Sequence, residues 1–114
     1  MNIKAFLAQF KRFRDLAVPV NFGDSDEPHV ILGKPAEIVS HQEGKRVVLF
    51  EGTAGSPCIT ADQLFKNIKQ LKDCDEFELV IIPADGKGFY PVDFVSARPI
   101  RGVIFLDCNK DTLR

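Results

Sequence analysis

A single histidine close to three acidic residues is the first place where this sequence could support chemistry. His29 follows Asp24, Asp26 and Glu27, and carboxylate oxygens with an imidazole nitrogen are ligands for hard or borderline cations. The segment lacks the D-x-[DN]-x-[DN]-G pattern of a calcium loop. We therefore interpret it as a solvated acidic turn beside a surface histidine. A metal-dependent enzyme at Asp24, Asp26 and His29 is kept as an alternative.

Nucleophilic catalysis needs a cysteine or serine beside a base that a third group orients. Cys58, Cys74 and Cys108 show neither CxxC spacing nor a catalytic-cysteine signature, and no GxSxG motif occurs. The glycine-rich segments 52–55 and 86–88 lack the GxxxxGK[ST] spacing of a phosphate-binding loop. The sequence therefore predicts no catalytic residue and no cofactor, and it favours reduced thiols in a cytoplasmic protein.

Basic residues are concentrated in two segments that have helical periodicity. Residues 1–14 hold four cations and no anion, and residues 66–72 hold three lysines and no anion. Together they form the predicted binding set: Lys4, Lys11, Arg12, Arg14, Lys66, Lys69 and Lys72. Two such helices side by side would present a basic face to phosphates, whereas the plainer interpretation is solubilising charge favoured by the helix dipole. Acidic residues follow each basic stretch, so we expect nucleic acid to be a disfavoured partner.

The overall composition is that of one ordinary globular domain. The chain has 114 residues, a formal net charge of −1 and 45% hydrophobic residues, with ten Phe and no Trp. A net charge near zero gives no general attraction to nucleic acid or membranes, and no apolar run approaches the ~18 residues needed to cross a bilayer. We expect a single domain over residues 1–114, a core rich in phenylalanine and no membrane partner.

The two halves of the chain resemble each other. Residues 35–51 and 91–107 align without a gap at an offset of 56, and two apolar helical stripes align at an offset of 58. The stripes are Ile3, Phe6, Leu7, Phe10 and Phe13, and Ala61, Leu64, Phe65, Ile68 and Leu71. Asn2 and Thr60 are suitable N-caps, and Thr60 with Gln63 predicts a capping box. These matches predict a duplication of residues 2–51 and 60–107, with a linker over 52–59.

The strands expected in each half complete the fold class. Alternating apolar residues predict strands over 18–22 and 77–82, with return strands over 29–40 and 89–97. Residues 47–50 and 103–106 are apolar on both faces, so we expect them to be the central strands and adjacent to each other. The prediction is an α+β domain of two degenerate α-β-β-β repeats, with a mainly antiparallel sheet of about six strands and two helices on one face.

A succession of short motifs runs through the second half. Thr60-Ala-Asp-Gln-Leu64 is followed by Leu71, by Val80-Ile-Ile, by Gly88 and by Pro91-Val92. This succession resembles a pattern in small uncharacterised bacterial and phage proteins, in which a T-x-x-x-L helix precedes a V-rich strand, a Gly turn and a P-V strand. The resemblance implies a bacterial or mobile-element origin and assigns no activity.

The functional prediction follows from these features together. Positions alike in both halves are expected to serve the shared fold, so positions present in one half are the better candidates for function. We expect a small non-enzymatic binding or interaction protein whose partner is a protein, acting by occupying the surface of a host protein. Nucleic-acid binding through the basic helix faces and a metal-dependent enzyme at the acidic turn are the two alternatives.

Overall fold

The computed structural model describes residues 1–24, 27–30, 36–41, 44–53, 57–98 and 102–108. For Asp24, residues 27–30, His41 and Arg98 it describes the backbone alone. The elements in chain order are α1 (Ile3–Phe10), the 3-10 helix η1 (Lys11–Phe13), β1 (Val20–Asp24), β2 (Glu27–Val30), β3 (Glu37–His41), β4 (Gly44–Phe50), α2 (Ala61–Lys69), β5 (Glu78–Ile82), β6 (Tyr90–Arg98) and β7 (Val103–Cys108). The α+β class predicted from the sequence is confirmed.

Each α-helix begins at the residue that the sequence predicts. Asn2 caps α1, because its side-chain Oδ1 accepts a hydrogen bond of 2.8 Å from the backbone N–H of Ala5. Thr60 and Gln63 form the predicted capping box of α2, in which the Thr60 N–H donates to Gln63 Oε1 over 3.2 Å. Both caps satisfy N–H groups that have no partner within the helix.

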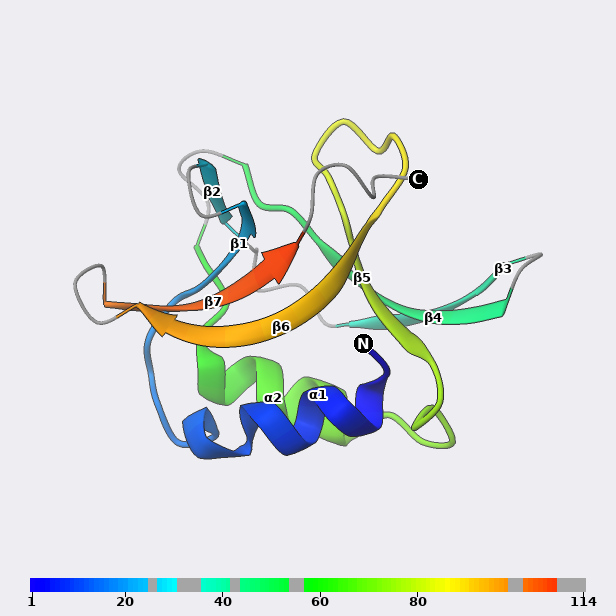
Figure 1. Cartoon of the computed structure of the whole chain (residues 1–114), viewed down its shortest axis with the longest axis horizontal. Helices are drawn as coiled ribbons and strands as arrows, with labels where there is room; N and C mark the ends of the chain where they lie inside the picture. The colour runs from blue at the N-terminus through cyan, green and yellow to red at the C-terminus, as the bar shows by residue number, and fades with distance from the viewer. Residues whose placement is uncertain (25–26, 31–35, 42–43, 54–56, 99–101, 109–114) are drawn as a thin grey trace.

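The apolar stripes of the two helices pack against one core. The helical residues buried there are Ile3, Phe6, Phe10, Phe13, Ala61, Leu64 and Ile68, which form one cluster with the strand residues on the same side of the sheet. Figure 1 shows both helices on one side of the curled sheet, as predicted. Leu7 and Phe65, which the periodicity also assigns to the core, are only partly buried.

The strands form one mixed sheet in the order β2-β1-β7-β6-β5-β4-β3. Four neighbouring pairs are antiparallel, whereas β1 with β7 and β4 with β5 are parallel. Parallel neighbours cannot be joined by a tight turn and need a crossover connection. For β4 and β5 this connection contains α2. The expected sheet of about six mainly antiparallel strands is therefore a mixed, seven-stranded one, in which β2 is the additional strand.

The strands predicted to be central are β4 and β7. Neither lies at an edge of the sheet, and residues 47–49 and 104–106 are buried on both faces. The expectation that β4 and β7 are adjacent is wrong, because β6 and β5 lie between them. Each is flanked by its own hairpin partner on one side and by the first strand of the other half on the other side.

The strand pairings of the two halves repeat at one spacing. Glu37 pairs with Val48 in the hairpin β3–β4, and Val95 pairs with Leu106 in the hairpin β6–β7, with both members 58 positions further on. The parallel pairs repeat likewise: Val20 with Ile104, and Glu78 with Arg46. These pairings follow the 58-residue offset of the helices and differ from the ungapped 56-residue strand alignment.

The start of each helix is hydrogen-bonded to the segment that leads into the first strand of the other half. Ile3 N donates to Phe77 O over 2.9 Å, and Ala61 N donates to Val18 O over 2.8 Å. Two bonds of 3.0 Å extend these contacts: Leu79 N to Met1 O, and Val20 N to Ile59 O. Ile59, which the sequence assigned to a linker, is buried at this contact. The crossed bonds hold α1 and α2 beside each other.

Phe10 and Ile68 test the buried helix faces. They occupy matching positions of the two helices and are each 0% exposed, so Phe10→Ala or Ile68→Ala should lower the free energy of unfolding by roughly 2–5 kcal/mol. Urea denaturation measures the loss, and Gln70→Ala at an exposed position should change it by about 0.5 kcal/mol or less. A loss below about 1 kcal/mol at both core positions would show that these faces are not the core.

Candidate functional site

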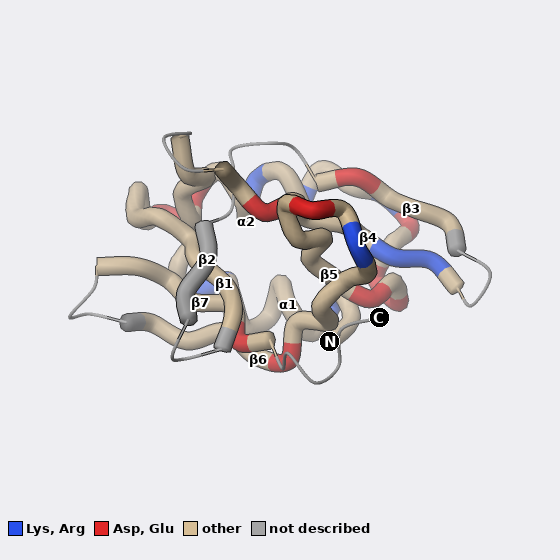
Figure 2. Tube along the Cα trace, turned by 90° about the horizontal axis from the view of Figure 1, so that it is seen from above, with Lys and Arg blue, Asp and Glu red and all other residues tan. Residues whose placement is uncertain are grey.

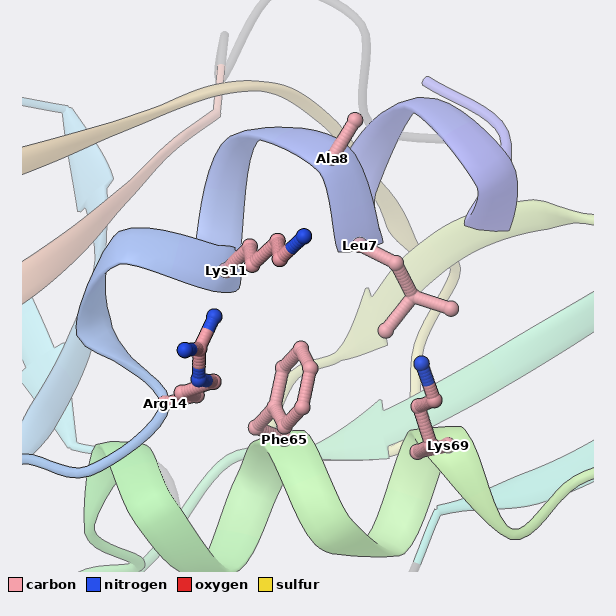
Figure 3. Close-up of a pocket in the computed structure, with 6 residues that line it drawn as sticks. All are labelled: Leu7, Ala8, Lys11, Arg14, Phe65 and Lys69. Carbon is pink, nitrogen blue, oxygen red and sulfur yellow. The ribbon is translucent and has the colours of Figure 1, made fainter.

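A hollow of about 450 Å³ lies between the two helices. Four of its lining residues come from the first helical segment, and two come from α2: Leu7, Ala8, Lys11, Arg14, Phe65 and Lys69. Figure 3 shows the side chains of all but Ala8 extending into the space between the helices. The hollow therefore has an apolar centre, Leu7 and Phe65, with three cations around it.

Helical spacing places these residues on facing surfaces. Leu7, Lys11 and Arg14 are separated by four and three positions, and Phe65 and Lys69 by four, so each set lies along one side of its helix. The Lys69 ammonium is 5.7 Å from the centroid of the Phe65 ring. Helix packing buries Leu7 and Phe65 only in part, which leaves apolar surface beside the cationic groups.

The cations of the hollow have few anionic partners. Arg14 Nε lies 3.7 Å from Asp15 Oδ2, but both side chains are exposed, so this contact contributes little. Neither Lys11 nor Lys69 has a carboxylate within ion-pairing distance among the described residues. Asp62 on α2 is already engaged, since a hydrogen bond from the Thr60 hydroxyl is the largest contribution that lowers the pKa of this carboxyl. The hollow thus presents uncompensated positive charge.

The structure gathers three members of the predicted binding set, Lys11, Arg14 and Lys69, in this hollow. The other four, Lys4, Arg12, Lys66 and Lys72, are exposed and do not line it. The Arg12 guanidinium lies instead 4.5 Å over the ring of Phe13. Figure 2 shows basic and acidic residues intermixed along the described trace. The cations therefore form a local cluster rather than one basic face.

Sequence reasoning missed the apolar half of the site. Leu7 and Phe65 fit the buried stripe of each helix, so periodicity alone assigns them to the core. A signal for the site was present, because each is followed four residues later by a lysine, Lys11 or Lys69. A partly apolar, partly cationic ridge on both helices could have been recognised from that spacing.

The acidic turn lies between two paired strands. β1 ends at Asp24, β2 begins at Glu27, and Phe22 pairs with His29. Asp26 lies outside the described residues, and so do the side chains of Asp24 and His29. In the part of the chain that is described, no group of three His, Cys, Asp or Glu side chains could hold a metal ion. The alternative of a metal site at this turn stays a prediction.

The three cysteines differ in their surroundings. Cys74 and Cys108 are buried, and burial raises the pKa of both thiols, that of Cys108 to about 12. Cys58 is partly exposed, and its Sγ donates to the Val20 carbonyl over 3.2 Å. Because the thiolate is the reactive form of cysteine, Cys74 and Cys108 have the character of core residues rather than nucleophiles.

Arg46 of β4 is a buried cation that sequence reasoning also missed. It is 6% exposed, and its guanidinium carbon lies 4.4 Å from the centroid of the Phe89 ring. Its Nε and Nη1 find no hydrogen-bond acceptor in the structure as described, although Glu78 faces it in the β4–β5 register. Buried donors without acceptors cost about 1–3 kcal/mol each, which contact with an aromatic face offsets in part. A Lys-Arg pair at the start of a strand is typical of solvent-exposed positions, so this burial could not be predicted from local sequence.

No protein-family model, curated protein or solved structure matches this chain. Within the described residues, no helix has the length and apolar character that crossing a bilayer requires.

Thiol alkylation tests the cysteine environments. At pH 8 we expect iodoacetamide to modify Cys58 first and Cys108 last, because a pKa of about 12 leaves almost no Cys108 thiolate. Peptide mass spectrometry of the native protein at timed intervals gives the order. The same raised pKa means that Cys108 favours the folded state below its unfolded value near 9, and that this contribution is lost as pH rises toward 12. Equal rates at Cys58 and Cys108 would contradict the assignment.

Replacement of Arg46 tests the unpaired buried charge. Arg46→Met keeps most of the unbranched stem and removes the donors, so the free energy of unfolding should stay the same or rise by up to about 2 kcal/mol. Arg46→Ala is the matched control and should lower it, because the packing of the stem is lost as well. Urea denaturation distinguishes these outcomes. If Arg46→Met costs more than about 1 kcal/mol, the guanidinium has an acceptor in solution.

Proposed function

We propose that this chain is a non-enzymatic binding protein that takes an acidic segment of a partner protein into the hollow between α1 and α2. The observation that carries the proposal is the grouping of Lys11, Arg14 and Lys69 around Leu7 and Phe65. The described lining contains no carboxylate, histidine, serine or cysteine. It therefore offers anion binding and apolar contact rather than acid–base or nucleophilic chemistry of the usual kinds.

An acidic protein segment would satisfy both parts of this surface. An apolar centre with a polar rim is the common anatomy of protein interfaces, in which aromatic residues near the centre contribute most. Phe65 occupies such a central position. Lys11 and Lys69 have no carboxylate partner within the described chain, so carboxylates of a partner would be attracted to them without competition.

Nucleic acid is the weaker candidate for the same cations. A nucleic-acid strand needs basic groups that follow its backbone, whereas the remaining predicted cations are exposed away from the hollow. Acidic residues also adjoin the helices, with Asp15 after the first and exposed Asp73, Asp75 and Glu76 after the second. These carboxylates would repel the phosphates that the lysines attract.

We further propose that the chain arose by duplication of an α-β-β-β unit, with β2 as an addition to the first copy. The strand registers that repeat at 58 residues support this proposal. Leu7 and Phe65 are also 58 positions apart, as are Lys11 and Lys69, and all four line the hollow. A site between two copies would use equivalent positions of both, so likeness between the halves does not exclude a residue from function.

The origin and location that we propose rest on the sequence and on the state of the cysteines. Resemblance of the second half to bacterial and phage proteins leads us to propose a phage or mobile-element protein whose partner is a host protein. Cys58, Cys74 and Cys108 are thiols that form no disulfide in the structure as described, which is typical of the reducing cytoplasm. The proposed binding site does not depend on either point.

Fluorescence anisotropy with a labelled peptide, in which Leu and Phe are flanked by Glu residues, tests the hollow. Lys11→Glu combined with Lys69→Glu should weaken binding by tenfold or more, about 1.4 kcal/mol, because two attractive contacts become repulsive. Arg12→Glu combined with Lys72→Glu makes the same change in net charge outside the hollow and should weaken binding by less than about threefold. Phe65→Ala should weaken it by about tenfold, since the central aromatic contact is lost.

Equal effects of the two double variants would mean that the peptide responds to net charge alone, and would overturn the site. Full binding by a peptide with Gln in place of Glu would contradict the electrostatic part. In gel-shift titrations we expect no complex with duplex DNA or RNA near physiological salt. A micromolar complex whose affinity falls with a slope of about −0.9 per phosphate contact would favour the nucleic-acid alternative.

A further inference from the structure

β3 is an edge strand that carries apolar side chains on both faces. It lies at the end of the sheet and, within the described residues, pairs with β4 alone. Ile38 is 42% exposed and Val39 is 36% exposed, and successive residues of a strand point to opposite faces. Residues 37–40 are all exposed, so the described part of the molecule leaves this strand uncovered. Exposed edges of this kind pair readily with another strand.

Two other strands have backbone groups that no neighbouring strand pairs, and both have protection that β3 lacks: the edge strand β2 and the part of the interior strand β6 that extends beyond β5. β2, at the opposite end of the sheet, contains Pro28, which has no backbone N–H to donate to a neighbour. β6, the counterpart of β3 at the 58-residue spacing, has two backbone groups occupied by groups outside its neighbouring strands. Gln9 Oε1 accepts from Val95 N over 3.3 Å, and the N-terminal ammonium donates to Val92 O over 2.6 Å. Among the described residues, no group outside β4 makes such a contact with β3.

We propose that β3 is the site at which a second copy of this chain adds its own β3, antiparallel and about a twofold axis through Val39. This pairing sets Val39 against its own copy, Ile38 against Ser40 and Glu37 against His41, so no like charges meet. The two sheets would then form one continuous sheet, in which the outer backbone groups of β3 are paired and Ile38 and Val39 of each copy gain cross-strand neighbours.

The size of the contact sets the expected affinity. One five-residue strand pair buries less surface than a standard interface of about 1,600 Å². The dimer should therefore be weak and reversible, with a dissociation constant on the order of micromolar to hundreds of micromolar. The interface lies in the sheet rather than between the helices, so this inference stands independently of the proposed binding site.

Sedimentation equilibrium over a concentration range up to about 1 mM, which brackets that affinity, tests the dimer. The unmodified chain should show a reversible monomer–dimer equilibrium. Val39→Lys should shift it to monomer by tenfold or more, because two lysines would meet at the twofold axis. Phe94→Lys is the matched control: Phe94 is 52% exposed on β6, an interior strand, so the same substitution there should leave dimerisation unchanged.

A charge-complementation experiment tests the register and guards against misfolding. Val39→Lys and Val39→Glu should each be monomeric alone, and an equimolar mixture should dimerise, because lysine then meets glutamate at the axis. A monomeric unmodified chain at the highest concentration would overturn the proposal. So would a Val39→Lys variant that still dimerises, or a mixture that stays monomeric while the unmodified chain dimerises.

Discussion

The residues that start each helix are hydrogen-bonded to the segment that leads into the first strand of the other half, at Ile3–Phe77 and at Ala61–Val18. The sheet shows the same crossing between halves, because in the parallel pairs β1–β7 and β4–β5 the first strand of one half pairs with the last strand of the other. The helix start and the first strand of each half therefore find some of their backbone hydrogen-bond partners in the other half. Because unpaired buried backbone groups are costly, this exchange fixes the strand order and holds the helices side by side. The hollow exists because the helices are held in this way.

Local features of the sequence were sufficient to predict both α-helices and every described strand except β2. Periodic apolar residues and N-caps at Asn2 and Thr60 define the helices, and doubly apolar segments identify β4 and β7 as interior strands. The strand order was not predictable, because side-chain alternation records which face of a strand is buried and not which strand lies beside it. The separation of β4 and β7 depends on pairing between residues far apart in the chain.

The candidate site was predicted in part for the same reason. The cations of the hollow were recognisable by charge, but Leu7 and Phe65 have the sequence character of core residues, and only the packing of α1 against α2 leaves them half-buried. Arg46 differs in the opposite direction: arginine is usually exposed, but this side chain is buried by contacts such as that with Phe89. In both cases burial is set by a segment distant in the sequence, which local patterns do not specify.

The exchange of strands between halves also bears on synthesis at the ribosome. A nascent chain grows from its N-terminus, and β1 lacks its parallel neighbour until β7 has emerged, because Val20 pairs with Ile104. The first half therefore cannot complete its folding until nearly all described residues have been synthesised. Until then Phe6, Phe10 and Phe22 cannot reach their final burial. Contacts of such long sequence separation slow folding and prolong exposure of apolar surface. We expect this chain to fold after rather than during its translation. In that interval its exposed phenylalanine side chains must be kept from associating with those of other nascent chains.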